Sequence, residues 1–283
     1  MRTVPYDPSL RALFQPELEP TVFVPGAAVA PALLAAECAR LAYKKFDRDP
    51  AARDEVVAAL AGVGYGDVAF FSVEGTDAYA AMHAASGAVV VAFRGTEQDP
   101  KDLATDARFV KVAWPGGGRV HGGFATAIEH VAPALTAWLS THPGPALFTG
   151  HSMGGALACL AASRATPARL VMFGCPRVGD AAFVATLARV AVERYVDCCD
   201  VVCRVPPAAF GFVHPVAPTY IDADGIVHTD LATMDVRADR RRAQDEYLRA
   251  HALHFLTNLP FRDLADHSPI NYVFPLQAAV PAG

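Results

Sequence analysis

Apolar and polar positions repeat along the chain with two different periods, and the change of period separates expected helices from expected strands. Helical spacing runs through residues 31–46 and 51–61. The stretches 64–75 and 77–96 instead alternate or run apolar, which is typical of strands. Because Ala88–Phe93 is apolar throughout, it predicts a central strand that is buried on both faces.

The second half of the chain alternates strand-like and helix-like segments. Residues 97–120 come first, and their polar, Gly- and Pro-punctuated sequence predicts a long loop with a short helix at 101–108. Strands are then expected at 146–150, 169–174, 193–198 and 219–225, and helices at 122–142, 154–165, 181–190 and, as the final long helix, 239–256. This alternation predicts an α/β fold with a mostly parallel sheet and helices on both faces.

The composition is that of a chain with a large core. Of the 283 residues, 53% are hydrophobic and 19% are charged, which argues against a disordered protein. We find no internal repeat and expect a single domain over residues 1–283, with the Pro-rich segment 1–25 wrapping its surface.

Charge and hydropathy narrow the classes of partner. The net charge is -5 and no basic stripe is present, so a nucleic-acid partner is not expected. The basic run Arg237–Arg242 is interrupted by Ala238 and Asp239, and we interpret it as a solvated helix end, with a binding patch as the alternative. No stretch of about 18 apolar residues lacks charge, so no transmembrane segment is expected. The first residues have no apolar leader, so we expect a cytoplasmic location, while export by another route stays open. The sequence does not indicate an oligomeric state.

Six cysteines are scattered along the chain, at positions 38, 159, 175, 198, 199 and 203. An even number of cysteines in a chain of this length does not by itself indicate a disulfide framework. The run Cys198–Cys203 could suggest a metal site, but it has no CxxC pair and no matching second half. We interpret all six as small, buried thiols and expect neither a metal nor an organic cofactor.

The segment GHSMG, Gly150–Gly154, matches the G-x-S-x-G pattern between an expected strand and an expected helix. This is the context of a nucleophile elbow, in which glycines on either side of a strained serine prevent backbone clashes. The amino end of the helix would also place positive dipole near the Ser152 hydroxyl. Ser152 is therefore a candidate nucleophile, and the alternative is a tight strand–helix turn that holds an idle serine.

A nucleophilic serine needs a base and an orienting carboxylate. In proteins whose serine sits on such a strand–helix elbow, the carboxylate and then the base follow the serine in the chain. Asp200 follows an expected strand, where its side chain can reach the carboxyl edge of the sheet, and His267 lies in a loop after the last expected helix. These positions favour the two residues only modestly. The other acids considered are Asp180, which is adequately explained as a helix N-cap, Asp197, Asp222, Asp224 and Asp230, and the other bases are His214, His228, His251 and His254.

Six motifs together give a more specific indication than the elbow alone. They are VVVAFRGT (89–96), VHGGF (120–124), FTGHSMGGALACLAA (148–162), FGCPRVGD (173–180), DCCDVVCRVPP (197–207) and DHSPINY (266–272). In this order they resemble the class 3 lipase family, the fungal-lipase-like branch of the α/β hydrolases. The resemblance implies Ser152 as nucleophile, Asp200 as acid and His267 as base.

The resemblance also implies an oxyanion hole, formed by the backbone N–H groups of Met153 and Thr96. Arg94, His121 and Asp180 match family positions that are expected to be structural or supporting. Taken together, the resemblance implies a serine carboxylic-ester hydrolase (lipase or esterase) that needs no cofactor. Two alternatives stay open: an acyltransferase that uses the same acyl-enzyme, and a non-catalytic lipid-binding protein on a hydrolase fold.

One segment departs from the family pattern. Fungal lipases carry a short amphipathic lid after the F-R-G motif, whereas residues 97–108 here are acidic and polar, with Leu103 as their only large apolar residue. A segment that opens onto an oil surface needs a broad apolar face, so weak or absent interfacial activation is expected. Phe210 and Phe212 could line an acyl pocket or belong to the core, and the sequence does not decide between these roles.

Overall fold

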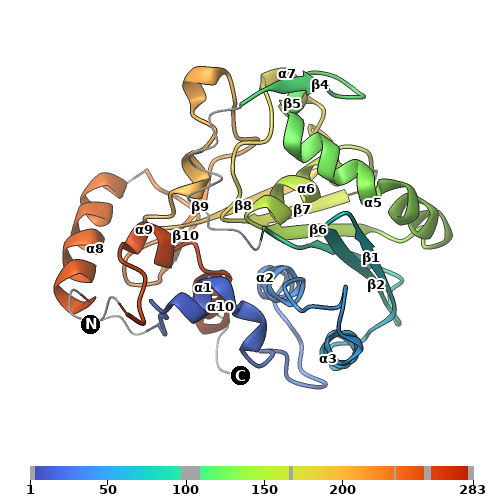
Figure 1. Ribbon diagram of the computed structural model, residues 1–283, viewed down its shortest axis with the longest axis horizontal. Helices are drawn as coiled ribbons and strands as arrows, with labels where there is room; N and C mark the ends of the chain where they lie inside the picture. Colours follow the sequence, from blue (N-terminus) through green and yellow to red (C-terminus); the bar gives the residue numbers. More distant parts are fainter. Residues whose placement is uncertain (1–3, 97–108, 166–167, 233, 252–255, 280–283) are drawn as a thin grey trace.

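One sheet, parallel in its middle and antiparallel at its edges, organises the molecule (Figure 1). The computed structural model describes residues 4–96, 109–165, 168–232, 234–251 and 256–279. In that part of the chain the strand order is β1-β2-β3-β6-β7-β8-β9-β10. The strands are Tyr65–Val73 (β1), Thr76–His83 (β2), Val89–Phe93 (β3), Ala146–His151 (β6), Ala168–Phe173 (β7), Ala191–Asp197 (β8), Thr219–Ile221 (β9) and Val227–His228 (β10). Strands β3, β6, β7, β8 and β9 run parallel, while β1, β2 and β10 pair antiparallel with their neighbours. The predicted mostly parallel sheet is therefore confirmed.

Helices cover both faces of this sheet. One face carries α5 (Gly122–Thr141) and α6 (Met153–Ala162), and the other carries α2 (Pro31–Leu41), α3 (Pro50–Ala61) and α10 (Pro269–Ala278). Alternate side chains of β3 enter different cores: Val91 packs with the α5–α6 side and Val90 with the α2–α3 side. Strand β3 is thus buried on both faces, as its apolar run predicts. Within the described ranges, no helix is both long and apolar enough to cross a membrane.

Three elements differ from the sequence-based expectation. Residues in the expected loop 97–120 pair as a short ribbon, β4 (Lys111–Ala113) with β5 (Arg119–His121), while the expected helix at 101–108 lies outside the described residues. The helix expected at 181–190 is only the short α7 (Ala181–Ala185).

The helix expected to be the final one is followed by two others. It is α8 (Val236–His251), and α9 (Arg262–Ala265) and α10 come after it. The sequence of α10, PINYVFPLQA, contains β-branched, aromatic and Pro residues that are poor helix formers. Its burial against α2 therefore determines its conformation more than local propensity does.

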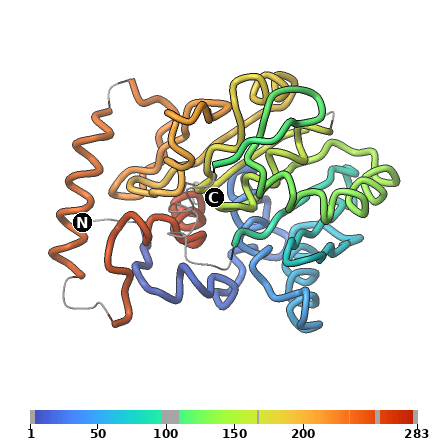
Figure 2. Tube along the Cα trace, turned by 45° about the horizontal axis from the view of Figure 1, so that its top comes forward, coloured from blue at the N-terminus to red at the C-terminus, as the bar shows by residue number. Residues whose placement is uncertain are grey.

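The N-terminal segment packs along the last elements of the chain (Figure 2). It contains the helix α1 (Leu10–Phe14) and a 3-10 turn, η1 (Pro16–Leu18). The backbone N–H of Asp7 donates to Asn271 Oδ1 at 2.9 Å, and Asn271 Nδ2 donates back to the Asp7 carbonyl at 2.9 Å. Ser268 Oγ donates to the carbonyl of Ala12 at 2.7 Å. The first described segment is thus tied to the residues that directly follow His267.

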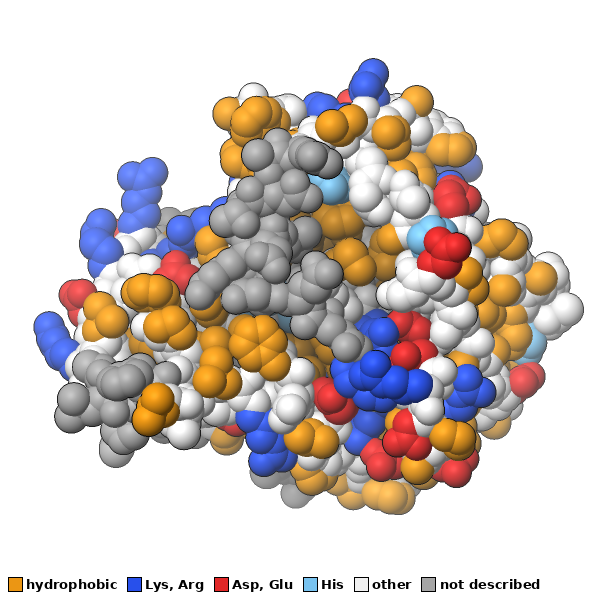
Figure 3. Space-filling view, in the orientation of Figure 1, with side chains coloured by type: hydrophobic (Ala, Val, Ile, Leu, Met, Phe, Trp, Pro, Cys, Tyr) orange, Lys and Arg blue, Asp and Glu red, His pale blue; other side chains and the backbone are white. Residues whose placement is uncertain are grey.

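The basic run 237–242 lies in the first turns of α8. Lys and Arg side chains gather on this edge of the molecule, at the left of the view (Figure 3). The Arg242 guanidinium pairs with Asp224 at 2.9 Å and with Asp239 at 2.9 Å, and Arg237 and Arg241 are exposed. The run thus lies at the start of a helix with Arg237 and Arg241 exposed, and its charge is partly balanced by neighbouring carboxylates.

Candidate active site

Ser152 occupies a sharp turn between β6 and α6. Its backbone has φ 57° and ψ -128°, a region that costs a non-glycine residue of order 1–3 kcal/mol. The turn is held by the Ser152 N–H, which donates to the Phe173 carbonyl at 2.9 Å. A Cβ on Gly150 would lie 2.2 Å from the carbonyl carbon of Gly154, and one on Gly154 would lie 2.2 Å from the Phe93 oxygen. Only glycine fits at both positions, which explains the G-x-S-x-G spacing.

The structure brings the predicted nucleophile, base and acid together, and hydrogen bonds join Ser152, His267 and Asp200 in one chain. His267 Nε2 lies 2.9 Å from Ser152 Oγ, and His267 Nδ1 lies 2.9 Å from Asp200 Oδ2. All three side chains are buried. They come from the β6–α6 elbow, the turn after β8, and the loop between α9 and α10. A serine hydroxyl, an imidazole and a carboxylate in this order can move a proton away from the hydroxyl as it attacks an electrophile.

Two further groups hold the carboxylate of Asp200. The backbone N–H of Val202 donates to Oδ1 at 2.8 Å, and the hydroxyl of Tyr272 donates to Oδ2 at 2.6 Å. Burial, reinforced by the Asp200 charge, raises the pKa of Tyr272 well above its usual value, so the phenol remains a proton donor. Sequence reasoning included Tyr272 in a motif but assigned it no role. The only available signal was its position five residues after His267.

The loop after β3 lies against the elbow. Arg94 is buried, pairs with Asp77 and lies 3.1 Å from an oxygen of Asp47, so its guanidinium anchors the start of this loop. A Cβ on the next residue, Gly95, would lie 2.8 Å from the His151 carbonyl oxygen. Thr96 follows directly, and Met153 is the first residue of α6. The oxyanion hole formed by the N–H groups of Thr96 and Met153 stays a prediction that is compatible with this arrangement.

Several other candidates from the sequence have structural partners instead. Asp180 caps α7 by accepting from the Phe183 N–H at 2.9 Å, which confirms its expected role. His214 Nε2 lies 2.8 Å from the Cys203 carbonyl, and burial lowers the pKa of this imidazole to about 3. His228 lies 2.8 Å from Asp222 on the β9–β10 edge. His251 ends α8 with its ring against Tyr247, and His254 lies outside the described residues.

The two phenylalanines after the acid have different environments. Phe212 is fully buried, and its ring lies 6.2 Å from that of His121, whereas Phe210 is 57% exposed. Both pack on Phe109, at centroid distances of 6.5 and 5.4 Å. Phe212 therefore belongs to the core, and only Phe210 has surface available to a ligand.

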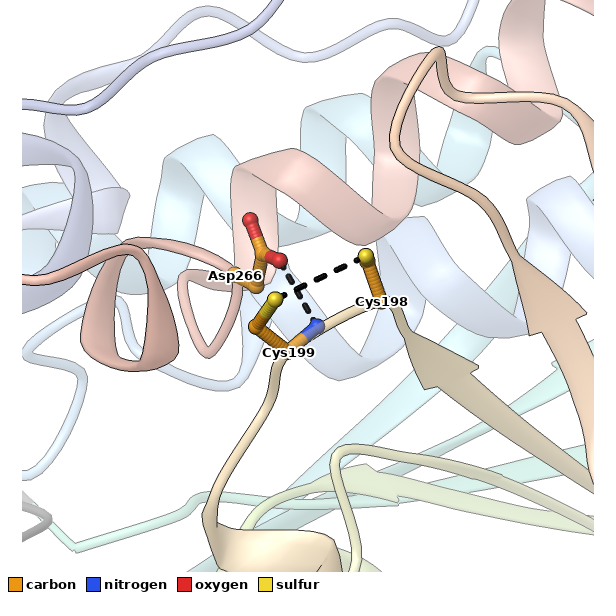
Figure 4. Close-up of side chains that lie close together, drawn as sticks. All are labelled: Cys198, Cys199 and Asp266. Atoms are coloured by element: carbon orange, nitrogen blue, oxygen red, sulfur yellow. Dashed lines mark hydrogen bonds between the residues drawn. The ribbon is translucent and has the colours of Figure 1, made fainter. Parts of the chain in front are cut away.

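A second buried cluster adjoins the site (Figure 4). Cys198 and Cys199 place their sulfur atoms 3.6 Å apart, beside Asp266. The Asp266 carboxylate already accepts from the Cys199 N–H at 2.9 Å and from the Tyr6 hydroxyl at 2.7 Å, and it pairs with Arg262 at 3.1 Å. The hydrogen bond with Cys199, followed by burial, raises the pKa of the Cys198 thiol, so this thiol stays protonated.

The donor set of this cluster does not favour a metal ion. An ion would have to displace thiol protons and compete with Arg262 for the carboxylate of Asp266. The cluster instead links the turn before Asp200 to the residue before His267. All six cysteines of the chain are buried and free, which confirms their interpretation as buried thiols.

Gly174 offers a test of the site's packing. It follows β7 with φ +57°, and a Cβ there would lie 2.8 Å from Asp200 Oδ2 and 3.1 Å from His267 Cε1. We expect Gly174→Ala to lower kcat/KM at least about 100-fold, because the methyl group displaces the acid and the base. The matched control is Gly26→Ala, which has a similar φ of +76° but nothing within 4 Å of the new Cβ. If the two variants hydrolysed substrate equally well, the described packing around Gly174 would be wrong.

A mostly parallel sheet with a serine elbow, followed in the chain by an Asp and a His that meet the serine, defines the α/β-hydrolase fold. A family profile described as Lipase (class 3) matches residues 90–210. Over this stretch the chain is similar to the class 3 lipases, and the relatives and solved structures described next are lipases as well.

The relatives are fungal lipases. A lipase from Rhizopus niveus is 34% identical over 136 residues, which are 42% of this chain and 34% of that protein. The Rhizomucor miehei lipase is 31% identical over 179 residues, which are 57% of this chain and 49% of that protein. A secreted mono- and diacylglycerol lipase from Fusarium solani is 32% identical over 176 residues and is covered over 52% of its length. The chain thus spans about a third to a half of the length of the curated relatives it matches.

Solved structures of fungal lipases are similar to this chain as well. The triacylglyceride lipase of Rhizomucor miehei superimposes with a TM-score of 0.56 at 28% identity, covering 67% of this chain and 77% of that one. A lipase from Rhizopus microsporus var. chinensis gives a TM-score of 0.54 at 26% identity, covering 77% of this chain and 81% of that one.

Proposed function

We propose that this protein is a serine carboxylic-ester hydrolase that cleaves lipid or small esters through an acyl-enzyme. The observation that carries the proposal is the continuous hydrogen-bonded chain from Ser152 through His267 to Asp200. The strained backbone of Ser152 supports it, because such strain is retained where it aims a nucleophile. The fungal lipases described above support the choice of ester substrates.

In the proposed reaction, Ser152 Oγ attacks the ester carbonyl carbon while His267 Nε2 accepts the hydroxyl proton. Asp200 keeps the proton of His267 on Nδ1 and stabilises the imidazolium. The N–H groups of Met153 and Thr96 stabilise the charge on the former carbonyl oxygen. His267 then gives its proton to the leaving alcohol. Water attacks the acyl-enzyme with His267 again as base, which releases the acid and restores Ser152.

The preferred class of ester is proposed from the sequence of this chain and not from the names of its relatives. One structural neighbour is described as a triacylglycerol lipase with a serine-protease-like triad, and a relative from Fusarium solani is named a mono- and diacylglycerol lipase. The polar segment 97–108 lies outside the described residues, so the proposed weak interfacial activation rests on its sequence. Soluble or short-chain esters are therefore proposed as the preferred substrates.

The direct test combines labelling with hydrolysis. A fluorophosphonate is expected to form one adduct, located on Ser152 by peptide mass mapping, because this hydroxyl is hydrogen-bonded to a base. p-Nitrophenyl esters from C2 to C16 should be cleaved with a short-chain optimum, and the rate should not jump when substrate passes its solubility limit. A protein that neither forms the adduct nor cleaves any ester would support the lipid-binding alternative. Added alcohol that diverts product into a new ester would support an acyltransferase.

A further inference from the structure

His151 lies directly before the nucleophile, yet the proposed reaction gives it no role. It is buried and is the last residue of β6. Its ring packs on that of His267, with a centroid distance of 4.5 Å and an interplanar angle of 41°. A second imidazole in contact with the base is therefore part of the site's architecture.

Tyr43, the residue after the C-cap of α2, holds the far side of this ring. The Tyr43 hydroxyl lies 2.8 Å from His151 Nδ1, and both side chains are buried. A phenol that donates to Nδ1 leaves the proton of a neutral imidazole on Nε2. In this tautomer the proton is on Nε2, the nitrogen nearer to His267. A Cβ built on Gly174 would lie 3.0 Å from His151 Nε2 and 3.1 Å from His267 Cε1.

The surroundings keep His151 neutral. Burial, reinforced by the nearby His267, lowers the pKa of His151 well below its usual value, while the backbone of His267 acts in the opposite direction. Two phenols also lie close to the ring, those of Tyr43 and Tyr272, the latter at a centroid distance of 5.7 Å. A neutral neighbour does not oppose the positive charge that His267 acquires when it accepts the serine proton.

Tyr43 also contacts the loop after β3. A Cβ on Gly95 would lie 2.1 Å from the Tyr43 hydroxyl and 2.8 Å from the His151 carbonyl oxygen. The hydroxyl therefore lies against the backbone between Arg94 and Thr96, the segment expected to supply one oxyanion donor. One side chain from α2 thus contacts both this loop and the imidazole that packs on the base.

We propose that His151, oriented by Tyr43, is a positioning residue that fixes the ring of His267 for proton transfer and links the base to the Thr96 loop. The role rests on the proposed ester hydrolysis. It acts on the catalytic step and not on substrate binding, because the ring contacts His267 and Tyr43 rather than a ligand surface. Removing it should let the base sample orientations that cannot accept the Ser152 proton.

Kinetics of three variants test the role. In His151→Phe, which keeps a ring but no nitrogen, kcat should fall about 10- to 100-fold while KM changes less than about twofold. Tyr43→Phe should act in the same direction, and the double variant should be no slower than His151→Phe alone, because both changes break one linkage. The matched control is His130→Phe on α5, whose ring bonds Thr76 away from the site and whose loss should leave kcat unchanged.

Three results would overturn the role: an unchanged kcat in His151→Phe, an effect confined to KM, or single effects that multiply in the double variant. A spectroscopic signature separates this failure from that of the proposed function. The downfield proton resonance of the His267 Nδ1–H to Asp200 bond should be sharp in the wild type and in Ser152→Ala, and broadened or shifted in His151→Phe and Tyr43→Phe. This resonance can be recorded without substrate, so it tests the positioning role even if no ester is cleaved. A sharp, unshifted resonance in both His151→Phe and Tyr43→Phe would contradict it.

Discussion

Replacing Ser152 with Ala is expected to lower kcat for ester hydrolysis by about 10⁶-fold, the scale seen when the triad serine is removed from a serine protease. The hydroxyl is the atom that forms the acyl-enzyme, and in this site its proton has an acceptor 2.9 Å away in His267. Substrate binding and oxyanion stabilisation survive the substitution, so a small residual rate above water is expected. Initial rates with the best p-nitrophenyl ester, measured at high enzyme concentration, give the ratio.

The matched control is Ser163→Ala at the other end of the same helix. Ser163 Oγ accepts from Trp114 Nε1 at 3.0 Å and donates to the Leu160 carbonyl at 2.7 Å, so its loss affects only local stability. Its kcat should equal that of the wild type. A Ser152→Ala protein that folds normally and retains more than about one hundredth of wild-type kcat would rule out Ser152 as the nucleophile, since the expected loss is several orders larger.

Replacing Asp200 with Asn is expected to lower kcat about 10⁴-fold with little change in fold. Asp and Asn side chains have the same shape. In the wild type Val202 and Tyr272 donate to the Asp200 carboxylate, and the carbonyl oxygen of an Asn can still accept from one of them. The amide, however, donates toward His267 Nδ1 and so leaves the imidazole proton on Nε2, where it blocks transfer from Ser152. The kcat/KM profile against pH and the melting temperature should be measured together.

Asp180→Asn serves as the control for this substitution. Asp180 belongs to the same family motif set but caps α7, and Asn is an equally good N-cap. Activity and melting temperature should both stay close to wild type. Equal activities of Asp200→Asn and Asp180→Asn would contradict the assignment of Asp200 as the acid.

Sequence reasoning located Ser152 because the elbow around it and the strand beside it obey strong local constraints. Gly150 and Gly154 are required by sub-3 Å approaches of backbone, and the apolar run at β3 reflects burial on both faces. Asp200 and His267 were less determined by pattern alone, since several acids and bases follow Ser152. Their choice depended on the resemblance to a family, and the structure then brought both residues to the serine.

The missed features depend on contacts between distant segments. Helix α10 has a weak local propensity and forms by packing on α2, so periodicity did not reveal it. Tyr272 lies on that helix, and without the helix its hydroxyl could not be placed beside Asp200. The β4–β5 ribbon is short and polar, and its register comes from pairs such as Lys111 with His121 rather than from an apolar pattern. Such features follow from tertiary structure, which overrides local preference.

The closure of the chain around His267 has a consequence for biosynthesis. Tyr6 and Ala12 bond Asp266 and Ser268, the residues on either side of the base, across about 260 positions of sequence. During translation the elbow with Ser152 emerges long before His267. The N-terminal segment cannot form its hydrogen bonds until Asp266 and Ser268 have been synthesised. A nascent chain therefore carries an unactivated serine, and reactivity toward a fluorophosphonate should arise only after residue 272 has left the ribosome. The last step of folding would then also be the step that switches on the chemistry.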